Sequence, residues 1–167
     1  MTLQRSNADF QCSFSVTKEP EIVYQPIVNF RGWWSEEIEG ITDILNETFF
    51  YHYQDVHRCT IRMIEDVPFK KIVYQVLENH FSFVKDQDDW VDSKLIFEIE
   101  SKNGNTGVFF KHEGLTPENE CYPVCHEAWT GYIEGSLKDL IRTGKGRPNP
   151  KQGGFNAELV NKWELDK

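Results

Sequence analysis

Two histidines, His57 and His112, are the residues of this sequence best suited to acid–base chemistry. Histidine titrates near neutral pH, so it can take up and release a proton under ordinary conditions. Catalysis by a histidine base also needs a group that orients the imidazole, and no carboxylate stands at a useful spacing from either residue. We therefore favour the interpretation of each as a hydrogen-bonded structural histidine over a catalytic one, and we assign no catalytic residue.

Motifs for metals and cofactors are missing from the sequence. Cys121 and Cys125 are separated by three residues, which is not the spacing of a redox pair, and no second pair of ligands completes a zinc site. The acidic run 85–89 lacks the glycine and the distal glutamate of a calcium loop, which favours a solvated turn. The run 144–146 lacks the leading glycine of a phosphate loop. We therefore expect no metal and no cofactor.

Two adjacent tryptophans, Trp33 and Trp34, are the most informative binding candidates. Tryptophan combines a large apolar ring with one polar N–H, and it favours cores and interfaces. Neighbouring side chains point in different directions from a strand or a helix. We expect one ring to anchor the segment to the core and the other to face a cavity, a partner or solvent. The alternative, in which both are structural, stays open.

Composition limits the class of protein. The chain has 167 residues, of which 39% are hydrophobic and 14% aromatic, so it can form one domain with a full core. A net charge of -9 and a pI near 5.0 argue against a basic face for nucleic acid. No apolar run reaches the roughly 20 residues of a membrane span. The first seven residues do not resemble a secretory signal. We expect a cytoplasmic protein with its cysteines as thiols.

The elements that position these residues begin with a strand. Phe10, Cys12, Phe14 and Val16 alternate with polar residues, which predicts a strand with one buried face. The run 17–21 then indicates a helix start with a proline in the first turn. Pro26 should kink or interrupt this helix. A second short helical turn is expected around the tryptophan pair.

From about residue 47 the hydrophobic period is 2, and turn residues separate the apolar runs. Regularly spaced hairpins of this kind predict an antiparallel meander with one buried face. The expected strands lie near residues 49–54, 58–63, 72–77, 94–100 and 108–112.

A long helix follows the strands. Trp129, Ile133, Leu137 and Ile141 recur with a helical period, Cys125 extends the stripe by one turn, and the run 116–118 is expected to open the segment. The helix is expected to end at Thr143-Gly144. The fold class is therefore α+β, a helix-grip arrangement in which a curved antiparallel sheet of about six strands wraps around a long C-terminal helix, with two short helices after the first strand.

The last part of the chain has the composition of a linker with a short helix at its end. Residues 145–154 are rich in glycine, proline and lysine. Asn156 could cap the final helix, and Phe155 could pack against Val160 as a hydrophobic staple. We divide the chain into a domain at 1–149 and a tail at 150–167, which we expect to be docked on its own body or on a neighbour.

The order of these elements resembles the START-like, Bet v-like (SRPBCC) superfamily. Within it, the chain is most similar to the branch named after the activator of the heat shock protein 90 ATPase. The resemblance covers about residues 9–149. It is carried by five segments: Phe14-Ser15-Val16 with Pro20-Glu21, Arg31-Gly32-Trp33-Trp34, Tyr53-Gln54-Asp55-Val56-His57-Arg58, Phe110-Lys111-His112-Glu113-Gly114-Leu115, and Trp129-x-x-Tyr132-Ile133-x-Gly135-Ser136-Leu137-x-x-Leu140.

The resemblance implies a deep, largely apolar cavity between sheet and helix, and a hydrophobic small molecule as its occupant. Alternation along the strands would bring one set of side chains to the concave face. The expected ligand-binding residues are Trp33, Trp34, Tyr51, Tyr53, Cys59, Tyr74, Phe97, Phe110, His112, Cys125 and Trp129. The same residues could instead form a filled core.

Two further functions stay open. One is a co-chaperone-like module that stimulates a heat-shock chaperone ATPase, because the branch takes its name from such a domain. The other is a cyclase or hydrolase with His112 or His57 as base. The expected partners are a hydrophobic small molecule and, in the second hypothesis, a chaperone; the protein would be a monomer or a homodimer.

Overall fold

A computed structural model describes residues 8–85 and 89–166 of the chain. The segment 1–7, which we expect not to be a secretory signal, and residues 86–88 of the predicted acidic turn lie outside the described residues.

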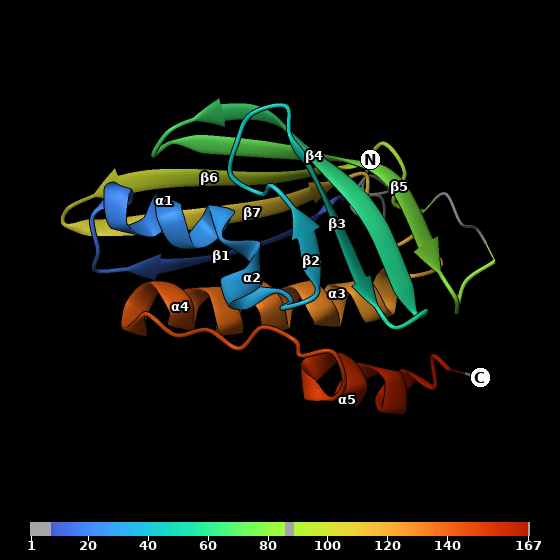
Figure 1. Ribbon diagram of the computed structural model, residues 1–167. Coiled ribbons are helices and arrows are strands. Elements are labelled where there is room, and N and C mark those ends of the chain that lie inside the picture. The colour runs from blue at the N-terminus through green and yellow to red at the C-terminus, as the bar shows by residue number, and fades with distance from the viewer. Residues whose placement is uncertain (1–7, 86–88, 167) are drawn as a thin grey trace.

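One antiparallel sheet contains every strand of the described residues, in the order β1-β7-β6-β5-β4-β3-β2 (Figure 1). The strands are β1 (Phe10–Val16), β2 (Ile38–Gly40), β3 (Thr48–Tyr53), β4 (His57–Val67), β5 (Lys71–Phe81), β6 (Lys94–Lys102) and β7 (Asn105–Glu113). The six predicted strands are confirmed. The additional strand, β2, has three residues, which is too short to produce a hydrophobic period.

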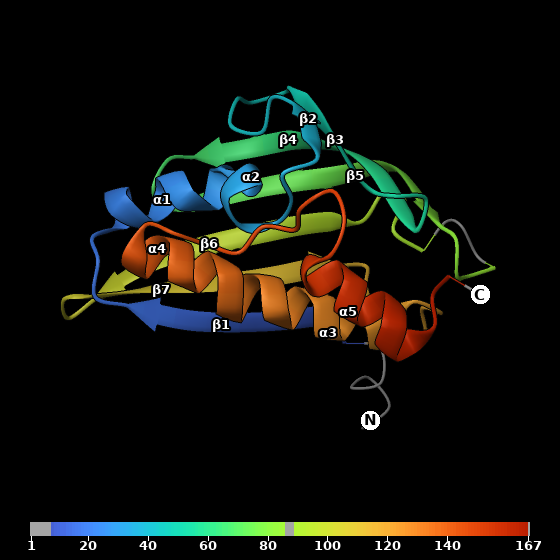
Figure 2. The same ribbon diagram turned by 60° about the horizontal axis from the view of Figure 1, so that its bottom comes forward.

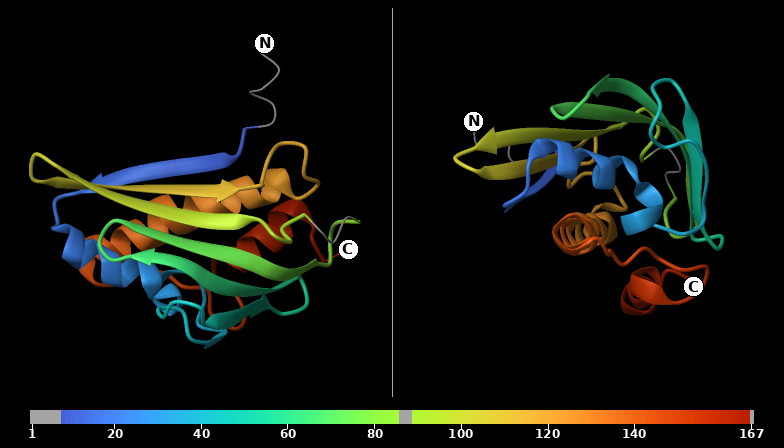
Figure 3. Two further views of the ribbon diagram at one scale, coloured as in Figure 1. Left: turned by 90° about the horizontal axis from the view of Figure 1, so that it is seen from above. Right: turned by 60° about the vertical axis from the view of Figure 1, so that its left-hand side comes forward.

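The sheet is curved, and its curvature creates the concave face. Two irregularities interrupt the register of β4 and β5, at Thr60/Ile61 and at Met63/Glu65. Extra residues of this kind bend a strand and increase its twist. Inward residues alternate with exposed ones, so that Phe49, Tyr51 and Tyr53 of β3 are buried while Phe50 is exposed. The sheet therefore curves over the long helix (Figure 3).

Two short helices follow β1, as predicted. Helix α1 (Pro20–Val28) begins with a proline at its first turn, and Glu19 is the residue before it. Pro26 does not interrupt α1, which ends two residues later at Val28. Helix α2 (Phe30–Trp33) then inserts Phe30 and Trp33 into the core. Phe30 packs on Phe49 with ring centroids 4.9 Å apart, so α2 fills the middle of the concave face.

The long helix consists of three consecutive segments: α3 (Tyr122–Thr130), a π-helical stretch η2 (Gly131–Leu137) and α4 (Lys138–Thr143). It starts at Tyr122, after a turn in which the Asn119 amide donates to the Thr116 carbonyl, so the run 116–118 precedes the helix. It ends where predicted, with Gly144 in the left-handed conformation at φ 84°. The predicted stripe is buried at Cys125, Trp129, Ile133, Leu137 and Ile141.

The chain continues from the long helix as a strap, residues 144–149, and then forms helix α5 (Gly154–Trp163). The strap runs along α2, where Asn149 pairs with Ser35, and α5 packs on α3 (Figure 2). The predicted cap of α5 is wrong: Gly153 precedes the helix, and Asn156 and Phe155 lie inside it, where they are neither cap nor staple. The division of the chain at 149/150 stays a prediction.

Candidate functional site

A small cavity lies where the β3–β4 hairpin, helix α3 and helix α5 meet. Its walls are mostly aromatic and aliphatic, and they come from the sheet, the long helix and the C-terminal segment. The lining residues are Trp34, Tyr51, Tyr53, Val56, His57, Phe81, Phe83, Trp90, Val124, Cys125, Ala128, Trp129, Tyr132, Asn156, Leu159, Val160 and Leu165. A few polar groups within an apolar lining are typical of small-molecule sites.

The cavity has a volume of about 50 Å³. That is room for a few water molecules, whereas ligand pockets usually measure roughly 300 Å³ or more. The resemblance implied a deep cavity, and the structure differs because two segments occupy the space. Helix α2 fills the middle of the concave face, and four residues of the C-terminal segment, Asn156, Leu159, Val160 and Leu165, cover the end that is left.

One ring of the tryptophan pair lies in the core and the other lines the cavity. Both rings are buried and they stack on each other with an interplanar angle of 16°. Trp33 donates from Nε1 to the Ile27 carbonyl at 3.1 Å and does not line the cavity. Trp34 lines the cavity, stacks on Tyr51 at 4.1 Å, and its buried Nε1–H has no hydrogen-bond acceptor. Neither ring faces solvent.

His57 is a cavity residue with one engaged nitrogen. Its Nε2 lies 2.7 Å from Asn79 Oδ1, which can only accept, so the ring proton is on Nε2. The ring stacks on Phe81 with centroids 4.2 Å apart. Burial lowers the pKa of His57 from its ordinary 6.5 to about 3, so the imidazole is neutral.

His112 lies in the core behind the cavity, and both of its nitrogens are engaged. Trp129 donates from its indole N–H to Nδ1 at 3.0 Å, so the ring proton is on Nε2, 2.7 Å from Ser93 Oγ. The Ser93 hydroxyl donates in turn to the Trp90 carbonyl. Burial lowers the pKa of His112 to about 3. An imidazole held in this way has no free nitrogen with which to act as a base.

The predicted ligand-binding residues separate into two groups. Five line the cavity: Trp34, Tyr51, Tyr53, Cys125 and Trp129. Six are buried in the filled core outside it: Trp33, Cys59, Tyr74, Phe97, Phe110 and His112. Tyr74 and Phe97 are separated from the cavity because Phe30 of α2 packs against them, at 5.0 Å and 6.2 Å. His112 is separated from it by the rings of Trp90 and Trp129.

Other cavity residues were not selected from the sequence. Trp90 lies in the loop before β6, where no period marks it as buried, although a tryptophan beside an acidic turn is itself a signal. Tyr132 was named only as part of the resemblance to the superfamily and not as a ligand-binding residue. The residues of α5 lie beyond the resemblance to the superfamily, and their apolar spacing at Leu159 and Val160 was the available signal.

A polar cluster joins α5 to the cavity wall. The Tyr132 hydroxyl donates to Asn156 Oδ1, and Asn156 Nδ2 donates to the Tyr51 hydroxyl at 2.9 Å. The Asn156 amide N–H donates to Asn149 Oδ1 at 2.8 Å, and Asn149 Nδ2 donates to the Trp34 carbonyl at 3.0 Å. All five residues are buried. Burial raises the pKa of both tyrosines, so their hydroxyls are neutral donors and acceptors.

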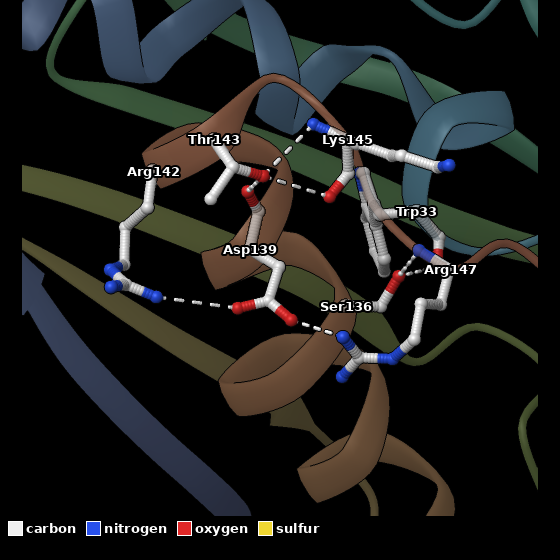
Figure 4. A network of polar contacts seen from close by, with 7 residues as sticks. All are labelled: Trp33, Ser136, Asp139, Arg142, Thr143, Lys145 and Arg147. Carbon is white, nitrogen blue, oxygen red and sulfur yellow. Dashed lines mark hydrogen bonds and ion pairs between the residues drawn. The ribbon is translucent and has the colours of Figure 1, made fainter.

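The strap that leads to α5 is fixed to the long helix by a second network (Figure 4). Ser136 Oγ donates to the Trp33 carbonyl at 2.8 Å and accepts from the Arg147 amide at 2.7 Å. On the outside, the Arg147 guanidinium bonds to Asp139, which also lies 3.5 Å from Arg142 Nη1. The strap therefore sets where α5 begins, and α5 itself ends with Lys162 Nζ 2.9 Å from Glu127 Oε1.

Two kinds of feature are missing from the part of the chain that the structure describes. No group of three or more His, Cys, Asp or Glu residues within 8–85 and 89–166 could hold a metal ion. No helix in those ranges is both long enough and apolar enough to cross a membrane.

The curved sheet, the long helix and the two short helices after β1 make up a helix-grip fold. One similar solved structure is described as the Aha1 dimer from Colwellia psychrerythraea, with a TM-score of 0.67 and 20% identity over 83% of this chain and 99% of that one. A second is SSP2350 from Staphylococcus saprophyticus, with a TM-score of 0.63 and 14% identity over 87% of this chain and 100% of that one. A third is CalU16 from Micromonospora echinospora, with a TM-score of 0.56 and 10% identity over 78% of this chain and 73% of that one.

At these sequence identities, the similarity to the solved structures shows a shared fold alone. No protein-family model and no curated protein sequence matches this chain.

Proposed function

We propose that this protein binds a neutral hydrophobic small molecule at the cavity beneath α5. The observation that carries the proposal is the lining itself, in which tryptophan, tyrosine and phenylalanine rings surround a space that the protein does not fill. Packed interiors contain few voids larger than a water molecule, so an aromatic cavity of this kind is unusual unless something binds in it.

The chemistry of the lining favours a neutral ligand. Lysine, arginine, aspartate and glutamate do not occur among the described lining residues. His57 is uncharged, because burial lowers its pKa to about 3. A charged ligand would lose its hydration without gaining a countercharge, and such a loss is costly in an apolar site.

Binding of a drug-sized ligand requires α5 to move. The sheet and the long helix are joined by extensive packing and hydrogen bonding, whereas α5 contacts the body along one side only (Figure 2). Its cavity side consists of Leu159 and Val160 with Asn156, and its far end is fixed by the exposed pair Lys162–Glu127. The C-terminal segment is therefore the wall of the cavity that can be displaced at least cost.

The test uses the full chain and the neutral fluorophore N-phenyl-1-naphthylamine. We expect saturable binding by the protein, and tighter binding by Leu159→Ala, which removes part of the α5 wall. Leu45→Ala is the matched control, because it is the same truncation at a side chain that is 45% exposed and outside the cavity. Its affinity should equal that of the unaltered protein. Native mass spectrometry of the purified protein then shows whether a ligand is already bound.

One pattern of results contradicts the proposal. If the fluorophore binds neither to the protein nor to Leu159→Ala, and native mass spectra contain only the mass of the chain, the cavity is a packing defect and the function lies elsewhere.

A further inference from the structure

The C-terminal helix places a carboxamide group between two tyrosine hydroxyls in the wall of the cavity. That group is the side chain of Asn156, which is buried although it lies in an otherwise amphipathic surface helix. Its carbonyl oxygen accepts from the Tyr132 hydroxyl, and its amide nitrogen donates to the Tyr51 hydroxyl at 2.9 Å. The two tyrosines belong to η2 and β3, so they are part of the rigid body that α5 covers.

Displacement of α5 would remove the acceptor of the Tyr132 hydroxyl and the donor to the Tyr51 hydroxyl. Asn149 Nδ2 of the strap would still donate to the Tyr132 hydroxyl at 3.3 Å, so its O–H would be the group left without a partner. A buried polar group that loses its hydrogen bond costs about 1–3 kcal/mol. A further donor in the same wall is already unpaired: the Trp34 ring stacks on Tyr51, and its Nε1–H has no acceptor. An apolar ligand could replace Leu159 and Val160, but it could not replace Asn156. The ligand must therefore bring its own polar group to this position.

We infer that Asn156 occupies the polar subsite of the cavity as an intramolecular ligand mimic, and that the natural ligand is an apolar molecule with a carboxamide group. The inference rests on the proposed function of the cavity. The ligand carbonyl would accept from Tyr132, and its N–H would donate to Tyr51, as the Asn156 side chain does. The ligand and Asn156 of α5 then compete for one site. The docking of α5 therefore raises the ligand concentration that is needed to half-saturate the protein.

Hydrogen-bond roles distinguish a carboxamide from other polar groups. A ketone supplies an acceptor and no donor, so it leaves the Tyr51 hydroxyl without the donor that Asn156 Nδ2 provides. An ionised carboxylate would need a cation, and the described lining residues contain no lysine or arginine. A planar amide has one strong acceptor and at least one donor on neighbouring atoms, which is the pattern that Asn156 presents.

The test compares benzamide with isopropylbenzene, which has the same number and connectivity of heavy atoms without the polar ones. We measure both affinities by tryptophan fluorescence, since Trp34 and Trp129 line the cavity, for the full chain and for Asn156→Ala. Asn156→Ala should bind benzamide about tenfold or more tightly than the unaltered protein does, and tenfold more tightly than it binds isopropylbenzene; a single good hydrogen bond is worth about that factor. Tyr132→Phe in the Asn156→Ala background should abolish the preference.

Outcomes separate this inference from the proposed function. If Asn156→Ala binds isopropylbenzene as tightly as benzamide, the cavity takes apolar ligands and the polar subsite is refuted. If benzamide binds equally well with and without Asn156, competition by α5 is refuted. If neither compound binds to any variant, both the inference and the proposed function fail. If Asn156→Ala does not fold, the affinities for benzamide and isopropylbenzene are measured with Asn156→Ser, which has a smaller polar side chain.

Discussion

Protonation of the buried histidines should destabilise the protein at mildly acidic pH. Burial lowers the pKa of His112 from 6.5 to about 3, and the Trp129 indole N–H already occupies the Nδ1 lone pair. Between these two pH values the unfolded chain binds a proton that the folded chain does not. Stability is therefore complete above pH 6.5 and is lost as the pH falls toward 3.

The loss can be calculated from the two pKa values of His112. Each pH unit below 6.5 costs about 1.4 kcal/mol, so at about pH 5 the cost is about 2 kcal/mol. His57 has the same pKa of about 3 and adds a similar amount, which gives about 4 kcal/mol for the pair. A loss of this size is a large fraction of the stability of an ordinary domain.

Urea unfolding followed by circular dichroism at about pH 7.5 and about pH 5 measures this loss. In His112→Asn one of the two histidine contributions disappears, so the difference between the two pH values should shrink by about 2 kcal/mol. An equal difference in the variant and the unaltered protein would refute the reasoning. An NMR titration of the unaltered protein measures the pKa of His112 directly. A pKa between 6 and 7 would also refute the reasoning.

Three substitutions, one in the strap and two at the residues of the long helix that contact it, follow from these contacts, and urea unfolding measures each. Ser136→Ala removes an acceptor from the Arg147 amide and a donor from the Trp33 carbonyl, and should cost about 1–3 kcal/mol. Gly146→Ala should cost about as much, because its Cβ would lie 2.4 Å from the Gly32 carbonyl oxygen, which is backbone and cannot turn away. Asp139→Asn should cost less than about 1 kcal/mol, since its arginine partners are exposed; a larger loss would show that the ion pairs hold the strap.

Local patterns in the sequence were sufficient to predict the framework of the fold. Alternation gave the inward faces of the strands, because one buried face fixes which residues of a strand point inward. The helical stripe and the stop at Gly144 gave the long helix. Both signals arise from short-range geometry, and neither depends on knowing which segments meet.

The cavity could not be predicted in the same way, because its shape depends on contacts between distant segments. Asn156 is polar and lies near the end of the chain, yet its partners are Tyr51, 105 positions away, and Tyr132. Trp90 lies in a loop, where side-chain direction has no period. The volume of the cavity depends on how much of the concave face α2 and α5 each cover. No local sequence pattern predicts that coverage.

The pairing of the first strand with the last has a consequence for the order of folding. Residues of β1 and β7 that face each other, such as Phe10 and His112, are about a hundred positions apart in the chain. Pairings of such separation slow folding, since a long loop must close before any contact repays the lost entropy. A nascent chain that ends before Asn105 leaves one edge of β6 and the whole of β1 unpaired. Unpaired edges are where sheets aggregate, so the vulnerable period of this protein's biogenesis lasts from the synthesis of β1 until β7 is complete.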